Sequence, residues 1–391
     1  MSRLREMIEE LCPDGVEYRK LGEIAEIVRG NGLQKKDFVD SGVGCIHYGQ
    51  IYTKFGAFAD KTLTYVTPEL AATLKKVSTG DLVVAITSEN VEDVCKCVAW
   101  LGNGDIVTGG HAAIVKHEQN PKYLSYIFQT EGFFRQKRKY VIGTKVIEMS
   151  PKKLAEIVIP VPPLPIQNEI VKLLDNFTEL TAELTAELLL RKKQYEYYRA
   201  RLLSFEKEQI EWVKIESICS IQRGRVMSKG DIAENKGNYP VYSSQTENNG
   251  ELGRISSFDF EGEYLTWTTD GANAGTVFYR DGKFSVTNVC GLLKVKSDAL
   301  LTKYLYYVLS IEAPKYVNSG MGNPKLMSNV MACVKIPLPL LKRQKEIVTI
   351  LDRFDTLCND LTQGLPAEIA ARKKQYEYYR DKLLTFPRKD A

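Results

Sequence analysis

The sequence predicts an α+β protein with two similar globular domains, each followed by a long helix. Its 391 residues, 44% of them apolar and 10% aromatic, supply two or three domains at about 150 residues per domain. The nonapeptide RKKQYEYYR occurs twice, at 191–199 and 372–380, and apolar residues at coiled-coil spacing precede each copy. We therefore predict that the two helices pair as an antiparallel coiled coil, with the repeats related by a pseudo-two-fold axis.

The internal repeat sets the predicted domain limits. The segment 159–177 (IPVPPLPIQNEIVKLLDNF) matches 336–354 (IPLPLLKRQKEIVTILDRF) at an offset of 177, whereas the nonapeptide repeats at an offset of 181. The second copy therefore has four extra residues between Phe354 and Arg372. The predicted organisation is a first domain at 1–165, a spacer helix at 166–207, a second domain at 208–342 and a second spacer helix at 343–387.

The two domains diverge between the repeated segments. GCIHYGQIYTKFGAF at 44–58 has NYPVYSSQTENNGEL at 238–252 as its counterpart, for example. Short β-branched and aromatic runs broken by Gly, Asn and Ser indicate mixed structure with many strands. Similar frames with different loops predict two related binding domains that recognise different targets.

Each spacer helix carries an apolar seam spaced by four and three residues. In the second helix this seam is interrupted at Gly364-Leu365-Pro366, where we expect a kink and a fresh helix start. The predicted seam residues are Ile166, Ile170, Leu173, Phe177, Leu180, Leu184, Tyr195, Tyr198, Leu202 and Phe205 in the first helix, and Ile347, Ile350, Phe354, Leu357, Leu361, Ile369, Tyr376, Tyr379, Leu383 and Phe386 in the second.

The four-residue unit TAEL occurs twice in tandem at 181–188. One such unit lengthens a helix by roughly 6 Å. We therefore interpret it as an adjuster of helix length.

Positive charge is concentrated in the repeated segments. The chain has 53 basic and 49 acidic residues, and its net charge of +4 does not by itself indicate a nucleic-acid binder. Residues 191–205 and 372–386 carry net charges of +4 and +3, which leaves about −3 for the remainder. In each segment one tyrosine lies off the seam beside basic residues: Tyr197 with Lys193 and Arg201, and Tyr378 with Lys374 and Lys382. Either these residues form a docking face for another protein, used twice, or the tyrosines only cover the coiled coil.

No catalytic, metal or phosphate-loop motif is recognisable. The three histidines have no metal-ligand spacing, Cys95 and Cys97 have no second pair, and no GxxxxGK[ST] occurs. The apolar runs are too short to span a membrane and the charged N-terminus does not resemble a signal peptide. We expect a cytoplasmic protein without membrane association, without a cofactor or metal of its own, and with reduced cysteines.

The arrangement resembles the specificity (S) subunit of type I restriction-modification systems over the whole chain. The IPxP segment before a long helix, the TAEL units, the paired RKKQYEYYR and the two divergent domains carry this resemblance. It implies that each domain is a target recognition domain binding one half of a split DNA sequence. It also implies that the helices act as a ruler and dock two methyltransferase (M) subunits carrying S-adenosylmethionine, and that restriction (R) subunits using ATP and Mg join the full complex. The S chain itself would be non-catalytic.

The candidate DNA contacts are polar and aromatic side chains in predicted loops. Asn and Gln suit adenine, and Arg and Lys suit guanine or phosphate. The candidates are Arg29, Asn31, Lys35, His47, Tyr48, Gln50, Ser88 and Lys145 in the first domain, and Arg223, Arg225, Tyr242, Ser243, Gln245, Thr269, Asn273, Asn323 and Lys325 in the second. The alternative is a dimerising scaffold whose lobes bind proteins or peptides. Salt-dependent binding to double-stranded DNA separates the two hypotheses.

Overall fold

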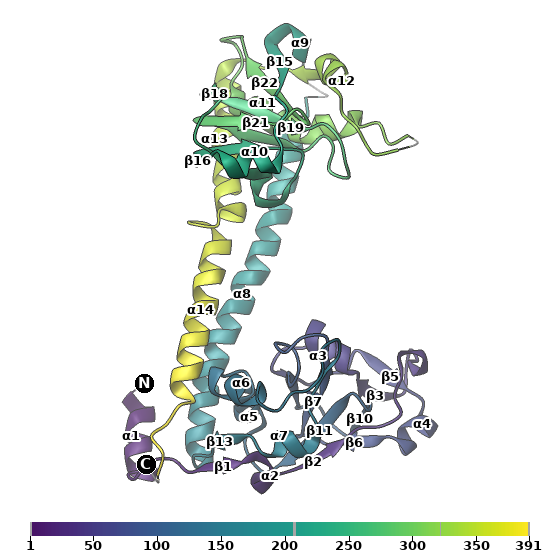
Figure 1. Cartoon of the computed structure of the whole chain (residues 1–391), viewed down its shortest axis with the longest axis vertical. Helices are drawn as coiled ribbons and strands as arrows, with labels where there is room; N and C mark the ends of the chain where they lie inside the picture. The colour runs from purple at the N-terminus through teal and green to yellow at the C-terminus, as the bar shows by residue number, and fades with distance from the viewer. Residues whose placement is uncertain (1, 206–208, 321, 390–391) are drawn as a thin grey trace. The chain divides into compact units, whose positions relative to one another are not determined.

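A computed structural model describes residues 2–205, 209–320 and 322–389. The chain divides into two compact units, one made of residues 1–184 with 369–391 and the other of residues 185–368. Each contains one globular domain, purple to blue in the first unit and green in the second (Figure 1). The predicted boundary between the first spacer helix and the second domain falls between residues 207 and 208, which lie outside the described residues.

The first domain is built on two main sheets. The five-stranded sheet has the order β2 (Ala25–Arg29), β11 (Ala112–His117), β7 (Leu82–Ala85), β9 (Cys97–Trp100) and β4 (Phe58–Ala59). The four-stranded sheet has the order β5 (Thr64–Val66), β3 (Val43–Ile46), β10 (Ile106–Thr108) and β6 (Lys75–Val77). Every residue of β7, β9 and β10 is buried, as expected for apolar runs that are covered on both faces.

Short helices and two further strand pairs complete the first domain. The pairs are β1 (Tyr18–Lys20) with β13 (Val158–Pro160), and β8 (Thr87–Ser88) with β12 (Ile147–Glu148). Asn120, Thr130 and Ser150 accept backbone N–H groups at helix starts, which satisfies donors that the helix leaves free. The helices are α1 (Ser2–Leu11), α2 (Leu21–Ile24), η1 (Lys35–Asp37), α3 (Tyr48–Thr53), α4 (Pro68–Thr73), α5 (Pro121–Ile127), α6 (Glu131–Lys137) and α7 (Pro151–Ala155).

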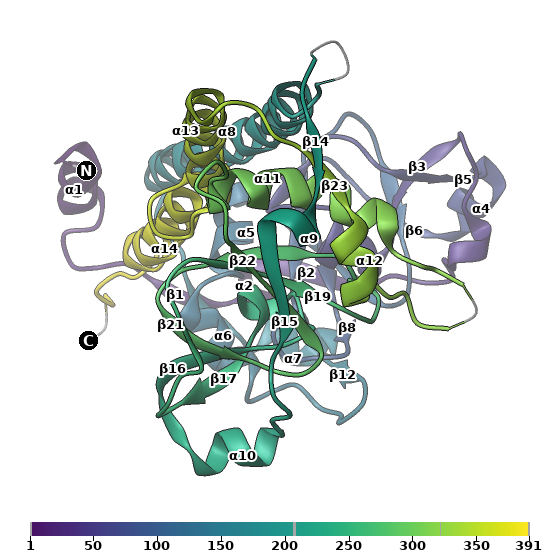
Figure 2. The ribbon, with the colours of Figure 1, turned by 90° about the horizontal axis from the view of Figure 1, so that it is seen from above.

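The second domain is also built on two main sheets, whose strands are green in Figure 2. One sheet has the order β15 (Cys219–Arg223), β22 (Cys290–Val295), β19 (Tyr264–Thr268) and β20 (Val277–Arg280). The other has the order β17 (Glu251–Ile255), β16 (Lys236–Tyr242), β21 (Lys283–Val286) and β18 (Phe260–Glu261), and β14 (Trp212–Lys214) pairs with β23 (Lys335–Pro337). The helices are α9 (Ile215–Ile218), α10 (Lys229–Glu234), η2 (Glu247–Gly250), α11 (Thr302–Glu312), η3 (Ala313–Tyr316) and α12 (Ser328–Cys333).

Long helices pair antiparallel within each unit, which confirms the predicted fold class. They are α8 (Leu164–Leu202), α13 (Leu341–Asn359) and α14 (Leu365–Leu383). In the first unit, the start of α8 and the end of α14 join the same core, and the Phe177 and Tyr379 rings stack at 5.5 Å. In the second unit, the start of α13 meets the end of α8, and Phe354 stacks on Tyr198 at 5.6 Å. The break between α13 and α14 lies at the predicted position.

The buried stripe of α13 differs from the predicted seam. Leu351 and Cys358 are fully buried, whereas Ile350 and Leu357, which the heptad pattern placed on the seam, are 38% and 37% exposed. Leu361 is 80% exposed and lies beyond the end of α13. The seam prediction was wrong at these positions because α13 packs against its own domain as well as against α8. The heptad pattern of a two-stranded coiled coil therefore does not decide which face of α13 is buried.

A repeated glutamine joins each domain to its helix. The buried Gln167 accepts from the Asn120 backbone N at 3.0 Å and donates to the Pro162 carbonyl at 2.8 Å. Gln344 repeats both bonds, from the Leu301 backbone N at 2.9 Å and to the Pro339 carbonyl at 2.8 Å. Because a buried amide is costly to leave unpaired, this bonding explains why Gln recurs at the same place in each copy.

A repeated aspartate makes a second link. Tyr126 Oη donates to Asp175 at 2.6 Å, and Lys122 pairs with the same carboxylate at 2.6 Å. Tyr307 donates to Asp352, and Lys303 lies 3.4 Å from it. Burial, with the hydrogen bond to the carboxylate, raises the pKa of both Tyr126 and Tyr307. The phenols therefore stay protonated donors, and the two domains are fixed to their helices in the same way.

Candidate nucleic-acid interface

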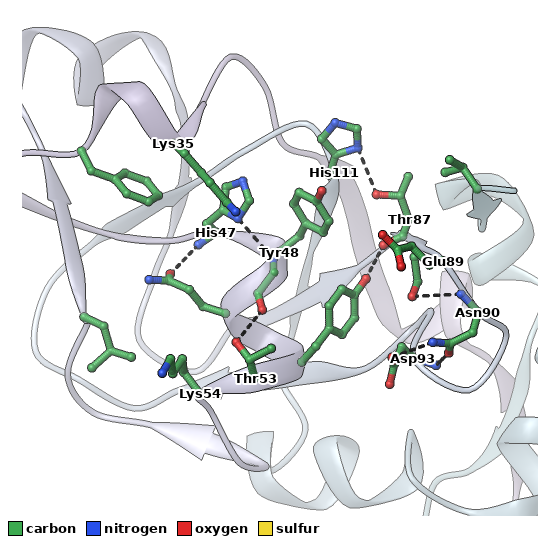
Figure 3. A pocket seen from close by; sticks show the side chains of 17 residues that line it. Lys35, His47, Tyr48, Thr53, Lys54, Thr87, Glu89, Asn90, Asp93 and His111 are labelled. Carbon is green, nitrogen blue, oxygen red and sulfur yellow. Dashed lines mark hydrogen bonds between the residues drawn. The ribbon is translucent and has the colours of Figure 1, made fainter. Parts of the chain in front are cut away.

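A cavity of about 830 Å³ lies in the first domain, with helix α3 and the loop after β8 among its walls (Figure 3). Five of the eight predicted DNA contacts of this domain line it: Lys35, His47, Tyr48, Gln50 and Ser88. They come from segments up to about fifty residues apart in the chain. The structure therefore brings together side chains that the sequence could only assign to separate loops.

An aromatic row forms part of the cavity lining. Figure 3 shows the side chains of His47, Tyr48 and His111 next to one another. The Tyr48 ring centroid lies 4.5 Å from that of His47 and 4.9 Å from that of His111. His47 Nδ1 accepts the Gly49 N–H at 3.2 Å, and Gln50 accepts the His47 N–H at 2.9 Å. Burial, and then the nearby Lys35, lower the pKa of His47. His47 is therefore a neutral aromatic group near pH 7.

The opposite side of the cavity is a polar loop, 88–94. Asn90 and Asp93 are joined twice, by Asn90 Nδ2 to the Asp93 carboxylate at 2.9 Å and by the Asp93 backbone N to Asn90 Oδ1 at 2.7 Å. The buried Lys137 ammonium donates to the carbonyls of Glu92 at 3.0 Å and Val94 at 2.7 Å. Since charge-assisted bonds to carbonyls are strong when buried, Lys137 fixes the shape of this loop from behind.

The remaining candidates of the first domain lie elsewhere. Arg29 pairs with Glu148 at 3.0 Å and donates to the Gly110 carbonyl at 2.8 Å. Asn31 connects the Thr73 carbonyl and the Lys75 N–H, at 3.0 and 2.9 Å. Both side chains therefore have structural bonds, although both residues are exposed.

Lys145 lies in an exposed hairpin closed by an Ile142–Glu148 bridge. At Gly143, with φ +107°, a Cβ would lie 1.9 Å from the Val146 carbonyl oxygen. This turn therefore requires glycine. The hairpin holds the exposed Lys145 on the domain surface.

In the second domain the candidates near β16 are ordered by a buried arginine. The Arg280 guanidinium lies 3.5 Å from the Tyr242 ring centroid and donates to the Asn249 carbonyl at 2.8 Å. Ser243 accepts from Thr287 at 3.0 Å, and Gln245 donates to the Glu251 carbonyl. Arg280 was not among the residues predicted from the sequence, because nothing in the linear pattern distinguishes a buried arginine from a surface one.

Other candidates of the second domain are exposed. Arg225 pairs with Asp259 at 3.0 Å, and Arg223 donates to Ser328 at 3.3 Å. Asn273 donates to Thr246 at 3.0 Å. Two further exposed candidates, Asn323 and Lys325, come after α11 in the chain, and the Lys325 backbone pairs with Asn318.

Thr269 is a correction to the predicted set. Its side chain is fully buried, and its hydroxyl donates to the Val289 carbonyl at 2.8 Å. A base edge could reach this hydroxyl only if the surrounding core opened. Thr269 therefore supports the fold.

Each predicted partner face is exposed in its own unit. Tyr197 is 58% exposed and accepts from Arg201 at 3.3 Å. Tyr378 is 61% exposed, with the Lys382 ammonium 5.7 Å from its ring centroid. Lys193 and Lys374 are exposed as well. The neighbouring tyrosines, 198 and 379, stack on Phe354 and Phe177, so the off-seam tyrosine of each pair is the more exposed one.

Among the described residues no group of three or more His, Cys, Asp and Glu side chains could hold a metal ion. Within the same part of the chain, no helix combines the length and the hydropathy that a membrane span needs.

Several residues of the cavity were not predicted from the sequence. The Thr87 hydroxyl and His111 Nδ1 share a hydrogen bond at 3.0 Å, and the Tyr52 hydroxyl donates to the Thr87 carbonyl. Asn90 stabilises the loop 88–94 through its bond to Asp93. No local pattern connects these residues. Their proximity depends on the pairing of β7 with β11, which no motif encodes.

Two divergent binding domains on repeated helices define a duplicated recognition protein. A family model for the type I restriction modification DNA specificity domain matches residues 13–191 and again residues 207–371. The chain belongs to this family and carries two copies of its domain.

Similar proteins agree with this assignment. The MpnII type I restriction enzyme specificity subunit of Mycoplasma pneumoniae is 49% identical over 204 residues, 50% of this chain and 62% of that protein. The EcoR124I/EcoR124II specificity subunit of Escherichia coli is 38% identical over 250 residues, 58% of this chain and 60% of that protein. Three shorter M. pneumoniae relatives align over 92% to 99% of their own length at 46% to 50% identity.

The fold is shared with solved structures at low identity. The crystal structure of a type I restriction-modification S subunit from M. genitalium superposes with a TM-score of 0.58 at 14% identity, covering 95% of this chain and 96% of that one. A chain from a type I restriction-modification assembly gives 0.61 at 17% identity, with 95% and 97% covered.

Proposed function

We propose that this chain is the non-catalytic DNA specificity subunit of a type I restriction-modification complex, in which each domain reads one half of a split, asymmetric target. The observation that carries the proposal is the combination of identical domain-to-helix links with unlike recognition surfaces. Gln167 and Gln344 make the same bonds, whereas the surfaces that they support share almost no residues. Two domains that are joined to their helices by the same bonds but have different surfaces suit the recognition of two different half-sequences.

The chemistry of each surface supports DNA as the ligand. The first cavity has exposed lysines, Lys35 and Lys54, beside neutral aromatic groups. The second surface presents exposed arginines at 223 and 225. Lysine and arginine attract phosphate, while amide and aromatic groups distinguish bases.

The helices supply the proposed spacing and docking functions. Tyr197 and Tyr378 lie exposed beside basic side chains on equivalent helix segments, and tyrosine is enriched at protein interfaces. We assign these faces to two methyltransferase (M) subunits. S-adenosylmethionine belongs to M, and ATP and Mg belong to the restriction (R) subunits of the full cytoplasmic complex.

The division of labour has a physical reason. A base methylated on its exocyclic nitrogen must leave the stack to reach a catalytic pocket. Register on the duplex is then set by a partner that holds phosphates and base edges. A chain with two such readers, each attached to a long helix, provides that register twice.

The test is a genome-wide map of N6-methyladenine in a methylation-free host that expresses this chain with its M subunit, compared with M alone. We expect a split, asymmetric motif that appears only when this chain is present. Transplanting residues 1–158 from a relative should then change one half-sequence and leave the other. If both halves changed, or if folded M bound to S-adenosylmethionine produced no motif with this chain, the proposal would fail and a protein-binding scaffold would replace it.

A further inference from the structure

The cavity of the first domain has the wrong shape for reading a paired base. Base edges of an intact duplex lie on the floor of a groove, so a protein reads them with side chains that project into that groove. A recess of about 830 Å³ is within the roughly 300–1,000 Å³ of ligand pockets. It can surround a base only if that base has rotated out of the stack.

The lining of the cavity suits a nucleobase. The row of His47, Tyr48 and His111 offers aromatic surface, and the lowered pKa of His47 keeps the buried end of the row uncharged. Stacking of a base on aromatic side chains is worth about 1–3 kcal/mol. The edge of a base would meet the Ser88 hydroxyl, which is on the lining and only 8% exposed.

Charge around the cavity fits the rest of a nucleotide. Lys35 and Lys54 line it, are exposed, and have no ion pair among residues 2–205, 209–320 and 322–389, so both can contact a phosphate. Glu89 also lines the cavity, exposed and without an ion pair in the described part of the chain. A carboxylate accepts hydrogen bonds from an exocyclic amino group, so the base that fits is one that carries such a group, namely cytosine, adenine or guanine, and thymine is excluded.

Hydrogen bonds within the domain fix the loop that carries Glu89 before any ligand binds. Asn90 and Asp93 bond each other twice, and Lys137 holds the carbonyls of Glu92 and Val94. A preformed wall loses little conformational entropy on binding. The site is therefore ready before DNA arrives.

We propose that this cavity binds one amino-bearing base of the first half-site after it has rotated out of the duplex, and that this base is distinct from the adenine that M methylates. The inference rests on the proposed function, because it needs DNA at this domain. It adds that the specificity subunit itself stabilises an extrahelical base, and that Glu89 helps to choose that base.

The experiment uses the complex of this chain with M and a duplex containing the motif found by the methylation map. A mismatch is placed opposite each base of the first half-site in turn. Extruding a mismatched base costs less than extruding a paired one, so binding should tighten about tenfold or more at one position in addition to the adenine that M methylates. 2-Aminopurine or pyrrolocytosine at that position should report unstacking.

Glu89→Trp fills the cavity and should abolish both signals, while binding through the second half-site continues. Glu118→Trp, at another exposed glutamate of the same domain, is the matched control and should behave as wild type. Glu89→Gln keeps the volume and should reduce the preference for an amino-bearing base, which separates the role of Glu89 from a defect in folding.

Each result has a defined meaning. If no position other than the methylated adenine responds to a mismatch while the complex still binds its motif selectively, the inference is overturned and the proposed function stands. If no DNA sequence is bound selectively, the proposed function fails. If free cytidine or adenosine monophosphate binds the wild type but not Glu89→Trp, and no duplex position unstacks, the cavity is a site for free nucleotides and base extrusion is rejected.

Discussion

Single residues of the first domain hold unusual protonation states because of where they are buried. His117, at the end of β11, accepts the Gln119 N–H on Nδ1 at 3.1 Å, and its buried Nε2 has no partner among the described residues. Burial lowers the pKa of His117 to about 4 from its usual 6.5. The folded state therefore resists a proton that the unfolded state accepts readily.

We expect acid to destabilise the first unit through His117. Between pH 6.5 and 4 the unfolded chain binds a proton that the folded chain does not, so stability falls as pH falls through this window. From pH 7.5 to 5 the loss should be about 2 kcal/mol. Urea unfolding followed by Trp100, the single tryptophan of that unit, measures it. His117→Gln should flatten this dependence, and an unchanged dependence in the variant would assign the acid effect to other groups.

Lys137 is a second buried residue with a measurable function. Its removal in Lys137→Met leaves the carbonyls of Glu92 and Val94 without their ammonium donor, a cost of about 1–3 kcal/mol. We expect faster amide exchange in 88–94 and weaker selectivity for the first half-sequence only. Lys116→Met, at a half-exposed lysine on β11, is the control. Loss of selectivity for both halves would contradict the local role.

At the scale of elements, the repeated residues are those that join a domain to its helix. Asp175 and Asp352 each receive a tyrosine and a lysine from the helix of the adjacent domain. Asp175→Ala should destabilise the first unit by about 1–3 kcal/mol, and Asp352→Ala should do the same to the second. Separate unfolding transitions, followed by Trp100 for one unit and Trp267 for the other, would show whether each loss stays within its own unit.

The exposed tyrosines give an opposite expectation. Because Tyr197 and Tyr378 are 58% and 61% exposed, Tyr→Ala at either should change stability by no more than about 0.5 kcal/mol. Binding of M should weaken about tenfold per substitution, as measured by titration calorimetry. Glu196→Ala, at the neighbouring exposed residue, serves as control. Wild-type affinity in both tyrosine variants would mean that these residues only cover the helix pair.

The fold could be predicted from the sequence where the chain repeats itself, and the residues of the cavity could be predicted only in part. RKKQYEYYR and the in-register Gln and Asp fixed the order of domains and helices because identity within one chain can be detected from the sequence alone. The heptad pattern failed at Ile350 and Leu357, which are exposed because α13 also buries part of its surface against the second domain. The cavity was only half foreseen, since Thr87, Asn90 and His111 meet through strand pairing. Thr269 was misplaced because a polar residue followed by Asp270 and Gly271 looks like a loop residue even when it is buried.

At the scale of the whole molecule, helix length should set the separation of the half-sites. Deleting Thr181–Leu184, one TAEL unit, shortens α8 by about 6 Å and rotates the remainder of the helix by about 40°. We expect the unspecified gap in the methylated motif to shorten by one or two base pairs at about 3.4 Å each, with both half-sequences retained. Sequencing of the methylome reads both quantities at once. Altered half-sequences would contradict the hypothesis that helix length sets the spacing of the half-sites.

The first unit cannot be completed until the residues after 368 have been made. Val16 bridges Arg388, the Tyr18 hydroxyl donates to the Phe386 carbonyl at 3.0 Å, and Leu383 and Leu384 belong to the core of the first domain. During synthesis the ribosome therefore makes all of 185–368, the second unit, before it makes the C-terminal segment that completes the core of the first domain. The part translated first is the part that matures last, and a premature stop before residue 369 leaves its apolar interior open to chaperones and proteases.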